Sequence, residues 1–134
     1  MGELQAERAS AWGLVITGNV SEVRAYDESG TCFSFVPTAN EGWRYALDVE
    51  NRRTDDCSYV SSALGSLGLS VWVEVEVLAK LVDEPAHLVL RQVIAGDRET
   101  ICGDRGLEII RMDTPSHWIA VGRRRRSADD TDLA

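Results

Sequence analysis

Few residues of the chain have the type and spacing that metal binding or thiol chemistry requires. The cysteines Cys32, Cys57 and Cys102 show no Cys-x-x-Cys spacing, and the only histidines are His87 and His117. No pattern along the chain brings these groups together. Cys32 and Cys57 fall where apolar side chains are expected, which favours small core residues. We therefore expect no metal site.

Other signatures of catalysis are also missing from the sequence. No serine stands in a Gly-x-Ser-x-Gly motif, and no glycine-rich phosphate loop is present. The acidic residues form no pair whose spacing indicates acid–base catalysis. We therefore expect a protein that is not an enzyme and that has no cofactor.

A run of four arginines is the strongest charged feature: Arg123, Arg124, Arg125 and Arg126. This run could bind phosphate groups or an acidic partner, or it could be a solvated tail that keeps the terminus soluble. The whole chain carries a net charge of −8. A strongly acidic body argues against promiscuous nucleic-acid binding, because such binding depends on neutralising phosphates. It remains compatible with a local basic groove.

Length and composition are typical of one globular domain, with 134 residues of which 44% are hydrophobic. No run approaches the ~20 apolar residues of a membrane helix. The first residues lack the apolar core of a signal peptide, so a cytoplasmic location is expected. We predict a flexible N-terminal arm over residues 1–10, a single β-barrel domain over 11–122, and a disordered tail over 123–134.

Alternation of apolar and polar residues predicts a chain made mostly of strands. The first strand begins at Trp12 and changes its apolar parity at Gly18–Asn19, which predicts a bulge or bend. The chain then continues with strands at Thr31–Val36 and Trp43–Glu50, a short helix at Cys57–Leu67, and strands at Ser70–Val82 and His87–Ala95. Further short strands are expected at Thr100–Cys102, Leu107–Met112 and Trp118–Val121.

This order of elements resembles the OB-fold, a five-stranded Greek-key barrel with a helix between its third and fourth strands. The resemblance covers Trp12 to Ala95 and rests on topology, without a family-specific motif. It implies an all-β class, with an OB-like barrel that carries extra C-terminal strands.

The resemblance also implies a site for single-stranded nucleic acid. OB-folds bind such strands on the face of their second and third strands, through aromatic stacking and cationic contacts. In this sequence the residues of that face are Arg24, Phe33, Phe35, Trp43, Arg44, Tyr45, Arg52 and Arg53. The alternative is that the aromatic residues are barrel core, which their regular alternation favours. The acidic segment Asp83-Glu84-Pro85-Ala86 would repel phosphates and argues against binding.

A second candidate surface is an apolar stripe on the strand predicted at Ser70–Val82. Trp72, Leu78 and Val82 share the outer parity of that strand, and exposed apolar stripes often mark contacts between proteins. Either the rest of the chain covers the stripe, or a partner or a second copy does. We therefore expect a non-catalytic binding module for single-stranded nucleic acid, with a protein-interaction or oligomeric accessory protein as the alternative.

Overall fold

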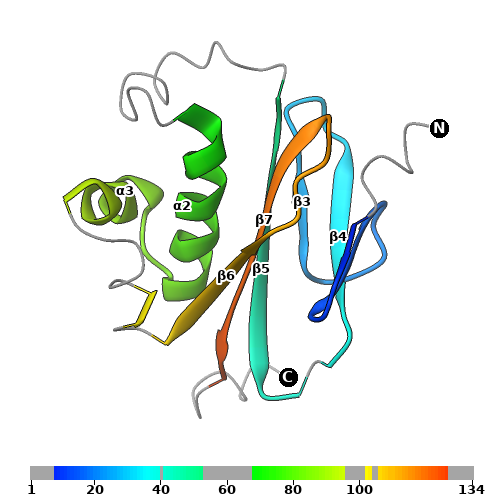
Figure 1. Ribbon diagram of the computed structural model, residues 1–134, viewed down its shortest axis with the longest axis horizontal. Coiled ribbons are helices and arrows are strands. Elements are labelled where there is room, and N and C mark those ends of the chain that lie inside the picture. The colour runs from blue at the N-terminus through cyan, green and yellow to red at the C-terminus, as the bar shows by residue number, and fades with distance from the viewer. Residues whose placement is uncertain (1–7, 40, 53–67, 96–101, 104–105, 127–134) are drawn as a thin grey trace.

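The computed structural model describes residues 8–39, 41–52, 68–95, 102–103 and 106–126. These residues form two antiparallel sheets and a layer of helices (Figure 1). The first sheet, sheet A, has the strand order β1-β2-β4-β3. Its strands are β1 (Arg8–Ser10), β2 (Gly13–Thr17), β3 (Arg24–Tyr26) and β4 (Cys32–Pro37).

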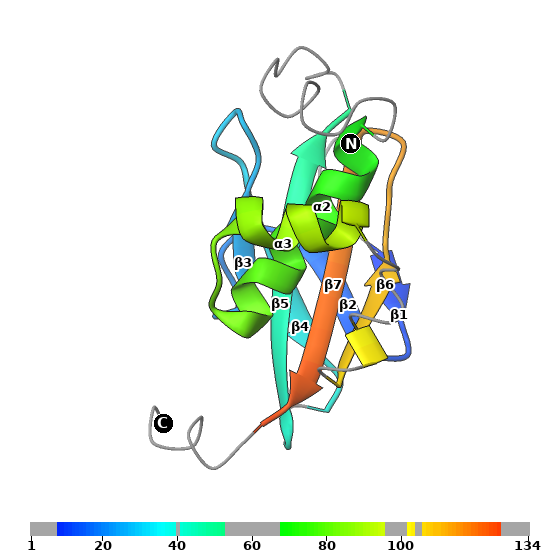
Figure 2. The ribbon, with the colours of Figure 1, turned by 90° about the vertical axis from the view of Figure 1, so that its left-hand side faces the viewer.

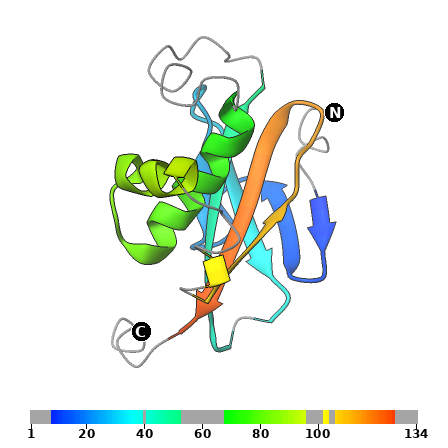
Figure 3. The ribbon, with the colours of Figure 1, turned by 60° about the vertical axis from the view of Figure 1, so that its left-hand side comes forward.

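The second sheet, sheet B, has the order β5-β7-β6. Its strands are β5 (Trp43–Asn51), β6 (Leu107–Arg111) and β7 (His117–Arg125). Since β5 and β7 are antiparallel, the start of β5 and the end of β7 lie at the same end of sheet B (Figure 3).

Helix α2 (Gly68–Val82) packs on one face of sheet B, and α3 (Ala86–Ala95) lies against α2 (Figure 2). Side chains at even positions of β5 and β7, such as Ala46 and Ala120, join the core under the helices. Odd positions, such as Leu47 and Val121, pack instead against sheet A. The alternation along β5 and β7 therefore serves two cores, one on each face of sheet B.

A close approach between α2 and β7 explains Gly122. A Cβ atom added at this residue would lie 2.4 Å from Val77 Cγ1 and 2.9 Å from Leu81 Cδ1. Together with Ala46 and Ala120, Gly122 gives sheet B a shallow surface on which a helix can lie.

The fourth and fifth strands predicted from the sequence, Ser70–Val82 and His87–Ala95, are wrong, because both segments are helical. Residues 71–82 include apolar side chains at even and odd positions, and such a run fits a buried helix as well as a strand. The 15 residues of α2 also exceed the usual strand length of about 5–6. In the helix, Val73, Val77 and Leu81 recur every four residues and are all buried.

The end of α2 contains a signal that strand reasoning overlooked. Asp83 adopts a left-handed φ of 57°, and the Glu84 N–H donates to the Ala79 carbonyl at 3.2 Å. This is the geometry of a Schellman helix end, in which the residue after the helix turns left-handed. Pro85 then follows, as is common just beyond a helix terminus.

The mainly β composition is confirmed, as are the strands predicted at Leu107–Met112 and Trp118–Val121, which correspond to β6 and β7. The break at Gly18–Asn19 is present, but β2 and β3 pair with opposite edges of β4 and are not one bent strand. Within the described residues the two sheets stay separate and close into no barrel. The OB-like barrel therefore stays a prediction.

Four other expectations concern segments at the margins of the described residues or outside them. The tail expected to be disordered from Arg123 differs from the structure, because β7 continues to Arg125. Similarly, β1 occupies the last three residues of the predicted N-terminal arm, and Cys102 lies in a helical turn where a strand was expected. The helix predicted at Cys57–Leu67 falls outside the described residues.

Candidate functional site

Two features predicted separately, the aromatic third strand and the arginine run, lie side by side at one end of sheet B. In the β5–β7 ladder Trp43 is opposite Arg125, and Tyr45 is opposite Arg123. Side chains two residues apart on a strand share a face, so Trp43, Arg123 and Arg125 all project from the face that sheet A covers further along.

On this face the guanidinium groups and the indole rings alternate. The Arg123 guanidinium carbon lies 4.0 Å from the centroid of the Trp12 ring and 3.9 Å from that of Trp43. The Arg125 guanidinium lies 4.1 Å from the Trp43 centroid. Side chains at positions 123 and 125 start roughly 6.6 Å apart, which leaves room for one flat ring between them. We call Trp12, Arg123, Trp43 and Arg125 the Trp–Arg stack.

The inner members of the stack are fixed by further contacts. Arg123 Nε donates to Glu108 Oε1 at 2.9 Å, and Trp43 O accepts a 2.9 Å hydrogen bond from Arg126 Nε. Each cation–π contact contributes about 0.5–1 kcal/mol where water still reaches it. The stack therefore joins the start of sheet A to the end of sheet B.

The outer members of this region are open to solvent. Arg125 and Arg126 are both exposed, and neither forms an ion pair with any residue that the structure describes. Arg124 projects from the other face of β7, where its Nε donates to the Leu81 carbonyl at 2.9 Å. The side chains of consecutive arginines therefore project from opposite faces of β7.

The remaining residues of the predicted nucleic-acid face do not share one surface. Phe33 and Phe35 are buried between the sheets, and Tyr45 is buried with its hydroxyl donating to the Ala39 carbonyl at 3.0 Å. The alternative interpretation, that the aromatic residues are core, therefore holds for these three, whereas Trp43 is only partly buried. Arg24 is exposed on β3, whereas Arg44 lies on the helix side of β5.

The two arginines beyond β5 were also predicted for that face. Arg52 stacks over the Trp118 ring at 3.8 Å from its centroid, far along the sheet from the Trp–Arg stack. Arg53 lies outside the described residues. The predicted face is thus divided among a core, two faces of sheet B and an edge of sheet A.

The predicted apolar stripe of Trp72, Leu78 and Val82 does not form. Leu78 is 1% exposed, and Trp72 and Val82 are partly buried against the helix-side core. The stripe assumed a strand period of two, whereas a helix turns 100° per residue and separates position 72 from 78 and 82. The chain itself covers this surface to a large extent.

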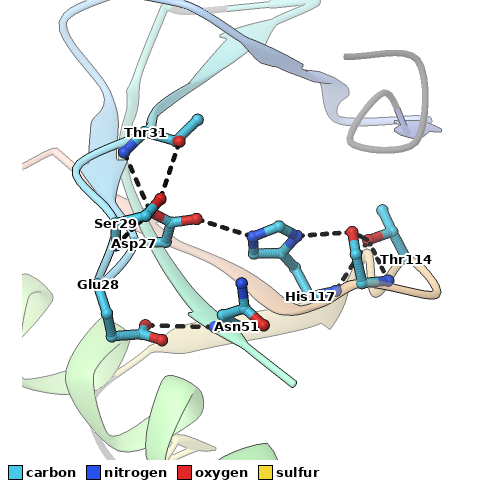
Figure 4. Close-up of polar contacts among 8 residues, drawn as sticks. Asp27, Glu28, Ser29, Thr31, Asn51, Thr114 and His117 are labelled. Carbon is cyan, nitrogen blue, oxygen red and sulfur yellow. Dashed lines mark hydrogen bonds and ion pairs between the residues drawn. The ribbon is translucent and has the colours of Figure 1, made fainter. Parts of the chain in front are cut away.

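A polar network of residues missed at the sequence level links the two sheets (Figure 4). Asp27 Oδ2 lies 2.9 Å from His117 Nε2, and Ser116 Oγ lies 2.7 Å from His117 Nδ1. The other oxygen of Asp27 accepts hydrogen bonds from the Ser29 and Thr31 N–H groups. Burial alone would raise the pKa of Asp27, but the hydrogen bonds from Ser29, His117 and Thr31 outweigh it and lower that pKa.

This network contains the residue types of a catalytic triad, but its geometry is that of a structural link. The side chains of Asp27 and His117 are only 3% and 12% exposed. Ser116 Oγ also lies 3.2 Å from Thr114 Oγ1, and the N–H groups of Ser116 and His117 both donate to that same oxygen. These two N–H groups are therefore not available to stabilise an oxyanion.

A group of carboxyls lies between β5 and α2. Burial raises the pKa of Asp48 to about 7, against the attraction of Lys80. Burial, the charge of Asp48 and a hydrogen bond with Glu28 raise the pKa of Glu50 to about 8. Burial also raises the pKa of Glu76. Among the described residues no group of three or more histidine, cysteine or acidic side chains could hold a metal ion.

No family model, no curated protein and no solved structure matches this chain. In the part of the chain that the structure describes, no helix is long and apolar enough to cross a membrane.

Proposed function

We propose that this protein is a non-catalytic module that binds single-stranded nucleic acid at the end of sheet B where β5 begins and β7 ends. The observation that carries the proposal is the Trp–Arg stack, together with the exposed Arg125 and Arg126 beside it. Proteins that bind single strands combine aromatic platforms with cations that follow the backbone. This end of the sheet has both.

The stack would present Arg125 as its outermost surface. Unpaired bases stack on guanidinium planes as well as on aromatic rings. A guanidinium held against Trp43 is pre-oriented, so less side-chain entropy is lost when a base packs on it. Arg126 would then contact the neighbouring phosphate, because its guanidinium is anchored by one bond to the Trp43 carbonyl and its other donors meet no acceptor among the described residues.

The acidic body limits this proposal to a local and salt-sensitive interaction. With a net charge of −8, the chain repels nucleic acid at long range, and the arginine-rich end opposes that repulsion locally. The OB-like barrel is not needed for this site, which is built on β5 and β7, with Trp12 from the turn between β1 and β2. The stripe at Trp72 offers less support for the alternative of a protein partner, since Leu78 is core.

Anisotropy of a labelled single-stranded oligonucleotide at low and physiological salt tests the proposal. Arg125→Ala should weaken binding by about 1–3 kcal/mol through the lost stacking contact. Arg126→Ala should reduce the slope of log affinity against log salt by about 0.7, the value for one phosphate contact on a single strand.

Arg91→Ala is the matched control, because Arg91 is an exposed arginine on α3, away from this end of sheet B. It should bind like the wild type. Residues 127–134 include Asp129, Asp130 and Asp132, so the assay is repeated with a chain that ends at Arg126. Absence of binding at low salt by both chains would retire the proposal.

A further inference from the structure

A groove separates the facing edges of the two sheets. The edge strand β3 of sheet A lies beside the edge strand β5 of sheet B without pairing to it. The groove between them has a volume of about 180 Å³. Residues 44–47 of β5 line one wall, the segment 22–24 lines the other, and Lys80 of α2 closes one side.

The β5 wall of this groove presents backbone N–H groups. In an antiparallel pair, alternate residues direct their N–H and C=O groups toward the partner strand and away from it. The Arg126 N–H donates to the Gly42 carbonyl. The backbone N–H and C=O groups of even residues in β5 therefore point toward β7, and those of odd residues point away from it. The Leu47 carbonyl follows this pattern, because it accepts a 2.7 Å hydrogen bond from Lys80 Nζ and not from β7.

The N–H groups of Tyr45 and Leu47 therefore face the groove. Neither group has a hydrogen-bond acceptor among the residues that the structure describes. An unpaired N–H on a sheet edge is satisfied either by water or by a ligand that accepts hydrogen bonds. A ligand in this groove would meet two N–H donors that are two residues apart along β5.

Three cations surround these donors and are held in place by other contacts. Arg44 makes a pair of 3.2 Å hydrogen bonds to Asp83 and one of 3.0 Å to the Lys80 carbonyl, which leaves two of its five N–H donors without an acceptor in the part of the chain that the structure describes. Lys80 Nζ lies 3.6 Å from Asp48 Oδ1, and Arg24 Nη1 donates to Asn19 Oδ1. Each cation thus has a fixed position and at least one remaining donor.

Hydrogen-bond donors dominate the lining of the groove. Among the described residues, Glu22 is the acidic residue that lines it. Arg44 pairs with Asp83, and Lys80 lies near Asp48 and Glu76; burial raises the pKa of Asp48 to about 7, so this partner of Lys80 is partly neutral at neutral pH. Three cations and two amide donors around a small space are the elements of an oxyanion site.

We infer that the groove between β3 and β5 binds a phosphate group, through the N–H groups of Tyr45 and Leu47 and the side chains of Arg24, Arg44 and Lys80. Its volume is well below the ~300 Å³ at which small organic ligand pockets begin, so it suits a small oxyanion. A tetrahedral phosphate can accept hydrogen bonds from several directions at once. The phosphate could belong to a nucleic-acid backbone or to a small phosphorylated molecule.

The site is independent of the proposed function, since neither ring of the Trp–Arg stack lines the groove. Inorganic phosphate is the probe, titrated at constant ionic strength into ¹⁵N-labelled protein, with chloride as the comparison anion. We expect saturable shifts of the Tyr45 and Leu47 amide resonances with phosphate and not with chloride. Arg24→Ala should weaken the apparent affinity on the order of tenfold, as expected for the loss of a charged hydrogen bond.

Arg8→Ala is the matched control, because Arg8 is exposed on β1, the opposite edge strand of sheet A. It should leave the titration unchanged, as should Arg125→Ala, which removes a member of the Trp–Arg stack. If phosphate leaves both amides unshifted in the wild type, or shifts them equally in Arg24→Ala, the inference is wrong. Failure of oligonucleotide binding alone would not affect this result.

A second titration distinguishes the two sources of phosphate. If the group belongs to a nucleic-acid backbone, a short single-stranded oligonucleotide should shift the Tyr45 and Leu47 amides and compete with inorganic phosphate. If it belongs to a small molecule, the oligonucleotide should leave these two amides unshifted while phosphate still binds. Both outcomes support a phosphate site, and they differ only in its ligand.

Discussion

Asp27 Oδ2 and His117 Nε2 lie 2.9 Å apart and join the turn after β3 to the first residue of β7. The contact crosses from sheet A to sheet B at the end of the molecule opposite the Trp–Arg stack. The two sheets are therefore linked at both ends, by the Asp27–His117 contact at one end and by the cation–π contacts of the Trp–Arg stack at the other.

The Asp27 link predicts a specific loss of stability in acid. The pKa of Asp27 is lowered in the folded protein, so its ionised form stabilises the fold above the unfolded value near 3.8. This contribution should decline as the pH falls below that value toward the lower folded pKa. Asp27→Asn should destabilise the protein by about 1–3 kcal/mol at pH 6, through weakened hydrogen bonds from Ser29, Thr31 and His117. Denaturant unfolding should show the difference from the wild type shrinking below pH 4; a difference that is constant with pH would contradict the assignment.

The set of carboxyls between β5 and α2 predicts that stability changes with pH in the opposite direction, at higher pH. Glu50 has a folded pKa of about 8 against an ordinary value of 4.5, so the folded state holds a proton that the unfolded state loses. Stability should therefore fall as the pH rises from about 5 to 8. Glu50→Gln should remove much of that decline and be more stable than the wild type at pH 8.

Glu41→Gln is the control for this experiment, because Glu41 is exposed before β5 and is not among the groups that shift the pKa of Asp48, Glu50 or Glu76. Its thermal melting temperature should follow the wild-type curve between pH 5 and 8. A Glu50→Gln protein that loses stability as steeply as the wild type would show that Glu50 is ionised in the fold.

Gly122 predicts how closely α2 must approach sheet B. The added methyl of Gly122→Ala would overlap Val77 and Leu81, and relief requires the helix to move or the side chains to leave their rotamers. We expect a cost of about 1–3 kcal/mol in chemical denaturation, as for other overpacked cores. Gly103→Ala, where an added Cβ meets nothing within 4 Å, should change stability little. Equal stability of the two variants would contradict the packing described for α2.

The strands of sheet B were predictable, β5 from its alternation and β6 and β7 from their short apolar runs, whereas their pairing was not. Trp43 and Arg125 are 82 positions apart, and nothing local indicates that they are neighbours. One signal could have been used: Trp43, Arg123 and Arg125 all occupy odd positions, which share a face once β5 and β7 are adjacent. Trp12 was assigned to the first strand and not to a site, because its contact with Arg123 depends on how sheet A lies on sheet B.

The two helices were mistaken for strands for a different reason. Valines alternate through Val71, Val73, Val75 and Val77, and this local pattern matches a strand, yet the same segment also fits one buried helix face. Tertiary burial on both sides decides between the two, and the sequence pattern alone does not report it. The helix end at Asp83 and Pro85 was the better local guide.

The indole N–H resonances of the tryptophans test the central claim most directly, because the tryptophans of the stack and those outside it report separately. Titration of a single-stranded oligonucleotide into ¹⁵N-labelled protein should shift the Trp12 and Trp43 signals and leave Trp118, which stacks with Arg52 at the other end of sheet B, unchanged. The shifts should weaken with rising salt. Shifts at Trp118 with none at Trp43 would place binding elsewhere and contradict the account.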